Sequence, residues 1–142
     1  MSIYSKPAKL AIHILRYIAE QNGEHLCTAH DLALESGVSE PTVAKVLQAL
    51  AKEGILESRK GPGGGFRLAL PPKKISLWWI IEALEGGPPL SGCIGGFKNC
   101  SDLDPCPLHD KWKRVKADLV RFLEGTSLQD VVTAARQIGQ FA

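Results

Sequence analysis

The chain has 142 residues, 44% of them apolar and 23% charged, a balance that allows a buried core and excludes a wholly disordered protein. Its net charge of +2 does not by itself indicate a nucleic-acid partner. However, the segment 59–74 contains five basic residues and no acidic one, which favours either a phosphate-contacting surface or a solvated basic loop.

Three helices are predicted in the first part of the chain. Apolar residues at helical spacing indicate the first over about 7–21. Thr28, followed by Asp31 in the capping-box position, begins a second helix that ends at Gly37, and Ser39 begins a third. Two short helices joined by such a turn describe a helix-turn-helix, although periodicity alone also fits an ordinary packed helical pair.

A β-hairpin with a basic tip is predicted next. Residues 55–58 and 66–70 have the pattern of two strands, and the turn between them contains Arg59, Lys60 and the glycine-rich run 61–65. The run lies between two strands and no Gly-Lys-Ser/Thr follows it, so it is not a nucleotide-binding phosphate loop. A helix-turn-helix followed directly by such a hairpin is a winged helix.

The third helix and the wing supply the candidate contacts to double-stranded DNA. They are Thr42, Lys45, Gln48 and Lys52 on the helix, and Arg59 and Lys60 at the wing tip. The first two lie near the amino end of the helix, where side chains reach base edges in the major groove, and the next two are expected at phosphates or the groove edge. The wing residues are expected in a minor groove or at phosphates. Each alone fits a solvent-exposed role equally well, but together they favour DNA.

The second half of the chain is predicted to form a helix from Ser76 to Gly86, a long loop, a fifth helix, and a short last helix beginning at Thr126 or Ser127. Apolar residues in the fifth helix recur in steps of four, three, four and three, the narrow stripe typical of pairing between helices. The stripe, which predicts packing against another helix, is Leu108, Trp112, Val115, Leu119 and Phe122.

The predicted fold class is therefore mainly α with a small β-wing, a winged helix-turn-helix plus a long C-terminal dimerisation helix. We divide the chain into a DNA-binding domain at 1–87, a cysteine-rich loop at 88–107, and the dimerisation and C-terminal helices at 108–142. No apolar run is long enough to span a membrane and the first residues lack a signal-peptide pattern, so we expect a cytoplasmic protein with no membrane partner.

Three of the four cysteines lie within fourteen residues. Cys93, Cys100 and Cys106 are spaced C-x6-C-x5-C, and His109 follows as C-x2-H. Thiolates are soft ligands that select zinc, copper(I) or iron–sulfur clusters, and the spacing lacks the paired C-x2-C of zinc fingers. We therefore favour an iron–sulfur cluster. Two other interpretations of these cysteines stay open: a zinc site with three cysteines and one histidine, and three unrelated thiols buried in a core. Cys27 is expected to be a small buried hydrophobic residue.

With these features the sequence resembles the Rrf-type winged-helix transcription regulators over nearly its whole length. The most specific pieces are the run Gly61-Pro62-Gly63-Gly64-Gly65-Phe66, the segment 75–86 and the three-cysteine loop. The resemblance implies that the three cysteines hold a cluster, with His109 as the fourth ligand of a 2Fe–2S form, which we favour over 4Fe–4S. It also implies a homodimer formed by the long helix and a regulator, expected to be a repressor, that senses iron or iron–sulfur status, redox state or nitric oxide.

Two departures from the family pattern concern the DNA target. Ala44-Lys45 stands where members often have Glu-Gln, and Lys60 stands where the wing arginine usually precedes the glycine run. For the fourth cluster ligand, His13 on the first helix or an external ligand are alternatives to His109.

The alternative function is a winged-helix regulator with a structural zinc or a thiol redox switch in the cysteine loop. An electron-transfer or catalytic iron–sulfur protein would leave the wing and the third helix unexplained. The sequence contains no nucleophile–base arrangement, paired acids or cofactor fingerprint, so we expect no enzyme activity.

Overall fold

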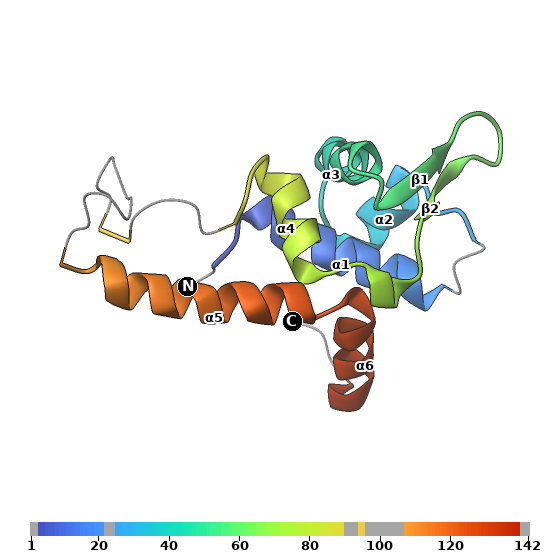
Figure 1. Cartoon of the computed structure of the whole chain (residues 1–142). Coiled ribbons are helices and arrows are strands. Elements are labelled where there is room, and N and C mark those ends of the chain that lie inside the picture. The colour runs from blue at the N-terminus through green and yellow to red at the C-terminus, as the bar shows by residue number, and fades with distance from the viewer. Residues whose placement is uncertain (1–2, 22–24, 90–93, 96–106, 140–142) are drawn as a thin grey trace.

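The computed structural model describes residues 3–21, 25–89, 94–95 and 107–139 (Figure 1). Within these ranges the chain forms helices and one two-stranded antiparallel sheet, which confirms the mainly α fold with a small β-wing. The elements are α1 Lys6–Glu20, α2 Ala29–Ser36, α3 Glu40–Lys52, β1 Leu56–Arg59, β2 Gly65–Leu68, the 3₁₀ turn η1 Pro72–Lys74, α4 Leu77–Glu85, α5 His109–Gly125 and α6 Leu128–Ile138. None of the helices in the described ranges is long and apolar enough to cross a membrane.

Local capping explains where the helices begin. The Thr28 hydroxyl accepts the Asp31 N–H at 3.1 Å, and the Asp31 carboxylate accepts the Thr28 N–H at 3.2 Å, so the predicted capping box of α2 is confirmed. Ser76 caps α4 as predicted by accepting the Trp79 N–H. Ser39 precedes α3, but its hydroxyl lies 2.8 Å from the Thr42 hydroxyl and makes no cap bond to the backbone.

The wing pairs its strands in the register Leu56↔Leu68, Glu57↔Arg67, Ser58↔Phe66 and Arg59↔Gly65. Both strands lie slightly nearer the tip than predicted. One reason is that the Ile55 N–H donates to the Leu50 carbonyl at the end of α3, so the ladder begins one residue later. The sequence also did not reveal that Cys27 forms a bridge with Phe66, through N–H···O bonds of 2.9 and 2.8 Å, at the outer edge of β2.

The main core lies among α1, α2, α3 and α4, and includes Leu128 from the start of α6. Ile14, Leu15, Leu47 and Leu50 are among its fully buried side chains, and the burial of such apolar side chains stabilises this unit. The helix α6 packs against α1 and η1, so it returns to the same unit.

The helix α5 is joined to this unit through α4. Its one fully buried side chain, Leu123, packs with Ala8 of α1 and Ile81 of α4 in a second, small cluster. In the view of Figure 1, α3 and the wing lie on the upper side, and α5 runs along the lower side with its N-terminal part projecting beyond the other helices. The long helix and the candidate DNA-binding elements therefore lie on opposite sides of the protein.

Candidate nucleic-acid interface

The helix α3 separates a buried apolar face from an exposed polar one. Its inward face is Val43, Val46, Leu47 and Leu50, all buried as predicted. The four side chains singled out on this helix, Thr42, Lys45, Gln48 and Lys52, are all exposed. Because the inward face is fixed in the core, the exposed face is held in one orientation toward solvent, as a recognition helix requires.

The outer face of the wing carries basic groups and one acidic group that is neutralised. The Arg67 guanidinium donates two hydrogen bonds to the Glu57 carboxylate, at 3.1 and 3.3 Å, across the β1–β2 pair. Hydrogen bonding and charge from Arg67, with a further contribution from Arg59, lower the pKa of Glu57. Arg59 and Lys60 lie exposed at the tip, beyond this pair. Near the tip the wing therefore presents net positive charge.

The turn of the wing requires glycine for steric reasons. Gly61 and Gly63 have φ values of +88° and +75°, which other residues adopt at a cost. A Cβ atom on Gly64 would lie 2.2 Å from the Arg59 carbonyl oxygen, and one on Gly65 would lie 2.8 Å from that of Cys27. The glycines therefore allow a close turn that sets the positions of the two basic residues at the tip.

The helix α3 and the wing are held together as one unit. Besides the bond from the Ile55 N–H to the Leu50 carbonyl, Ile55 and Leu56 are buried in the same core cluster as the inward face of α3. Phe66 and Leu68 of β2 pack against that cluster. The two elements thus present their exposed polar groups in a fixed relation on one side of the protein (Figure 1).

Cys93, Cys100 and Cys106 lie outside the described residues. His109, the remaining predicted ligand, is the first residue of α5 and is partly buried. In the ranges that the structure describes, no group of three His, Cys, Asp or Glu side chains is placed to hold a metal ion. The cluster site therefore stays a prediction from the donor set of the sequence.

The fourth cysteine and the alternative histidine are both described. Cys27 is 2% exposed within the main core, which confirms the expectation of a small buried residue. Burial raises the pKa of its thiol, and the nearby Asp31 raises it further. His13 lies half-buried on α1, where desolvation and then the charge of Arg16 lower the pKa of its imidazole.

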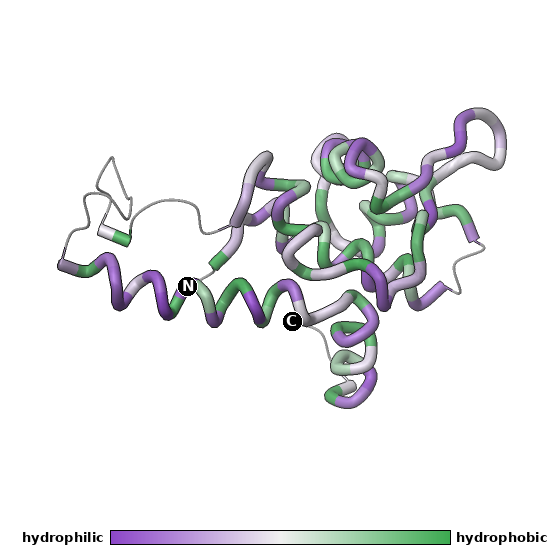
Figure 2. The backbone as a smooth tube through the Cα atoms, in the orientation of Figure 1, coloured by the Kyte–Doolittle hydropathy of each residue, from purple (hydrophilic) through white to green (hydrophobic). Residues whose placement is uncertain are grey.

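The predicted apolar stripe of α5 is largely exposed in the single chain. Leu108, Val115 and Phe122 are 50%, 51% and 58% exposed, while Trp112 and Leu119 are partly buried. In Figure 2 hydrophobic and hydrophilic stretches alternate along this helix. Leu123, the residue that attaches α5 to its own chain, was not predicted from the sequence, because it lies beside the stripe and does not share the spacing of the stripe.

Comparisons with known proteins match almost the whole chain. A family model described as "Rrf2: Iron-dependent Transcriptional regulator" matches residues 4–134. An HTH-type transcriptional regulator of Aquifex aeolicus is 34% identical over 132 residues, covering 92% of this chain and 91% of that protein.

Two solved structures share the fold. CymR (YrzC), the global cysteine regulator of B. subtilis, superposes with a TM-score of 0.74 at 23% identity, covering 94% of this chain and 98% of that chain. IscR of T. potens superposes with a TM-score of 0.75 at 22% identity, covering 97% of this chain and 91% of that one. At these identities the likeness shows the winged-helix fold, in agreement with the predicted fold class.

Proposed function

The chain belongs to the Rrf2 family of iron-dependent transcriptional regulators, and on that premise we propose that it binds a pseudo-palindromic operator as a homodimer under the control of an iron–sulfur cluster. It is a DNA-binding regulator and not an enzyme. The observation that carries the proposal is the combination, in one short chain, of an exposed basic recognition surface and a segment with three closely spaced cysteines.

The recognition helix and the wing have different roles in this proposal. Thr42 and Lys45, exposed in the first half of α3, contact base edges in the major groove and set the sequence preference. Gln48 and Lys52 lie further along the same exposed face and contact phosphate or the groove edge. Arg59 and Lys60 at the wing tip contact phosphates or the minor groove, and supply affinity more than sequence preference.

These roles are tested by comparing two lysine substitutions on duplexes of different sequence. Lys60→Ala is expected to weaken binding to all duplexes and to reduce the slope of log affinity against log salt by up to about one unit. Lys45→Ala is expected to change which base is preferred at one position in each half-site. Lys111→Ala on α5, an exposed lysine outside this surface, is the control and should bind like the wild type. If the Lys45 and Lys60 variants also bind every duplex like the wild type, the assignment of contacts is wrong.

The homodimer is proposed to form through the stripe on α5. Three exposed apolar side chains, Leu108 at the N-cap of α5 and Val115 and Phe122 on the helix, are covered if the same helix of a second copy packs against them. A twofold axis through that contact places two recognition helices and two wings on one duplex. The operator then consists of two inverted half-sites about one helical turn apart, or a multiple of it.

The cluster ligands in the proposal are Cys93, Cys100, Cys106 and His109. Three thiols and an imidazole suit a 2Fe–2S cluster, and the family description as iron-dependent supports iron over zinc. When bound, the cluster would supply a group whose oxidation state depends on redox conditions and whose presence depends on iron supply. The donor set follows from the sequence, and His109 is the one member of it that the structure describes.

The elements that flank the cysteine segment connect it with the DNA-binding unit. Before the segment, α4 packs against both α1 and α3, and Ile80 is buried in the main core. At the end of α4, the Glu85 carboxylate accepts the Ser5 N–H at 3.0 Å, which ties α4 to the start of α1. In the proposal, a change in the segment acts on the packing of α3 through α4.

The cluster assignment is tested on protein purified without oxygen, by iron and acid-labile sulfide analysis together with the visible spectrum. The proposal predicts both elements, their loss or weak retention when any of the three cysteines is changed to alanine, and an unchanged spectrum for Cys27→Ala. His109→Cys should keep a cluster with a lower reduction potential, since a charged thiolate replaces a neutral imidazole, and His109→Ala should make the cluster labile. Stoichiometric zinc, or a metal-free protein whose thiols oxidise reversibly, would contradict it.

A further inference from the structure

The hydroxyl group of Ser39, the residue before α3, bonds to a side chain instead of to the main chain. At the starts of α1, α2, α4 and α6 the capping hydroxyl accepts the N–H of the third helical residue. Ser39 makes no such bond, and its hydroxyl oxygen lies 2.8 Å from that of Thr42, the third residue of α3. The Ser39 hydroxyl thus acts on a side chain of the recognition helix and not on the end of the helix.

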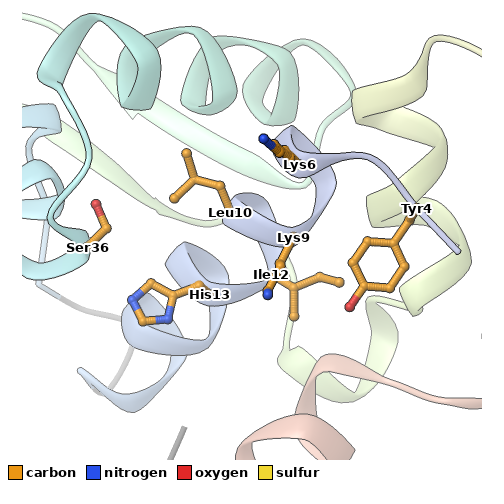
Figure 3. Close-up of a pocket in the computed structure, with 7 residues that line it drawn as sticks. All are labelled: Tyr4, Lys6, Lys9, Leu10, Ile12, His13 and Ser36. Atoms are coloured by element: carbon orange, nitrogen blue, oxygen red, sulfur yellow. The ribbon is translucent and has the colours of Figure 1, made fainter. Parts of the chain in front are cut away.

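The backbone around Ser39 is fixed by hydrogen bonds on both sides. Before it, the Val38 N–H donates to the hydroxyl of Ser36, the side chain at the end of α2 that Figure 3 shows at the edge of the α1 pocket. After it, the Val43 N–H donates to the Ser39 carbonyl at 3.1 Å, and Val43 is fully buried. These bonds hold Ser39 in one position beside Thr42.

The direction of the Thr42 hydroxyl matters because this side chain is exposed in the first turn of α3. A threonine in a helix is divided between two χ1 rotamers, which place its oxygen and its methyl group differently. In the major groove the two groups read different features, since the hydroxyl bonds to polar base edges and the methyl group contacts the thymine methyl. The bond to Ser39 selects one rotamer, and with it one way of reading the base.

The other residues in the first turn of α3 leave this bond to Ser39. The Glu40 carboxylate lies 3.4 Å from Nδ1 of His30 at the start of α2, so it is directed toward that helix. Pro41 has neither a polar side chain nor an N–H group. Within the described ranges, Ser39 is therefore the residue whose side chain sets the direction of the Thr42 hydroxyl.

We propose that Ser39 is a positioning residue for base recognition. Its hydroxyl holds the Thr42 side chain in one rotamer and thereby sets which base is preferred opposite Thr42. The inference rests on the contact of Thr42 with a base edge in the proposed function. Ser39 itself needs no contact with DNA, because its effect is exerted through Thr42.

The first test uses the full-length protein without DNA. Three-bond couplings from the Thr42 methyl carbon to its own nitrogen and carbonyl carbon measure χ1 by NMR. We expect a single rotamer in the wild type and in Ser39→Thr, which keeps the hydroxyl, and an average of two rotamers in Ser39→Ala. The urea midpoint of Ser39→Ala should equal that of the wild type, whereas Thr28→Ala, which removes a cap of the main chain, should lower it. Averaged couplings in the wild type, or equal losses of stability in Ser39→Ala and Thr28→Ala, overturn the proposal.

The second test is a double-mutant cycle on DNA. The probes are a duplex selected from a random pool by the wild type and its single-base variants. Thr42→Val is expected to reduce the discrimination between bases at one half-site position by about three- to tenfold, as the loss of one neutral hydrogen bond gives. Ser39→Ala should reduce it at the same position by about two- to fivefold, and Ser39→Thr should retain it. When Thr42 is already valine, Ser39→Ala should change nothing further.

The outcomes distinguish this inference from the proposed contacts with DNA. Additive losses in the double variant would show that Ser39 contacts DNA by itself. A changed preference in Thr42→Val with an unchanged one in Ser39→Ala would show that Ser39 does not act on Thr42. Either result overturns the inference and leaves the contact of Thr42 in place. An unchanged preference in Thr42→Val overturns the inference together with that contact, while Lys60→Ala still reports separately whether the wing binds DNA.

Discussion

Replacing Phe122 by alanine is expected to dissociate the proposed homodimer without unfolding the chain. Phe122 is 58% exposed in the single chain, so it contributes little to the packing of α5 on its own protomer. That packing is provided by Leu123, which is 2% exposed. A substitution at Phe122 therefore tests the interface between two copies, whereas a substitution at Leu123 would disturb the core of a single copy.

The magnitude follows from the exposed area of this side chain. A phenylalanine buries about 200 Å² when it is fully covered, so 58% exposure leaves about 115 Å² for a partner to cover. At about 25 cal/mol per Å² this area corresponds to about 3 kcal/mol per protomer. Alanine retains part of that area, so the variant loses up to about 4 kcal/mol per dimer. The dimer dissociation constant is then expected to rise by as much as about a thousandfold.

Sedimentation over a range of protein concentrations measures this dissociation constant directly. Leu34→Ala is the matched control, because Leu34 is also an exposed apolar residue, 72% exposed, but lies on α2. Helical circular dichroism should be the same for both variants and the wild type. A dissociation constant of Phe122→Ala within threefold of the wild type, or a wild type that is monomeric, would refute the reasoning.

Two further predictions concern the wing and one concerns the cap of α2. Gly64→Ala places a methyl group against a main-chain carbonyl, at a cost of about 1–3 kcal/mol, and should weaken DNA binding. Gly87→Ala is the control, because the space around its Cβ is open, and it should bind DNA like the wild type. Equal DNA affinities of the two variants would contradict this prediction. Thr28→Ala removes the cap of α2 and should lower the free energy of unfolding in urea by about 1 kcal/mol; an unchanged value would show that the cap contributes nothing. Arg67 lowers the pKa of Glu57, so the ion pair between them is fully formed, and orders the wing, at pH values above the ordinary glutamate pKa. As the pH falls through the lowered pKa of Glu57, the carboxylate is protonated and the ion pair is lost. An NMR titration should show this lowered pKa, and Arg67→Gln should return it toward the ordinary value.

The features that the sequence predicted well depend on residues close together in the chain. The capping box of Thr28 and Asp31 and the helix stop at Gly37 need only local geometry, and both were placed correctly. The inward face of α3 could be predicted because its apolar residues recur at helical spacing, and the apolar face that they form must be covered by the core. The winged-helix order of elements then limits the fold to one arrangement.

The features that the sequence did not predict depend on contacts between distant segments. The bridge from Cys27 to Phe66 joins residues far apart in the chain, and no local pattern announces it. Periodicity identified an apolar stripe on α5, but it did not show that Leu123, beside the stripe, faces the protomer's own core.

The central claim, that a cluster on the cysteine segment controls DNA binding, is tested most directly by one comparison. A duplex selected from a random pool is titrated anaerobically with the protein as purified and with the same preparation after chelation of its iron. We predict that the two affinities differ by about 5- to 150-fold, the usual range of allosteric coupling, and that the difference vanishes in Cys100→Ala. Equal affinities of the two wild-type preparations would contradict the claim.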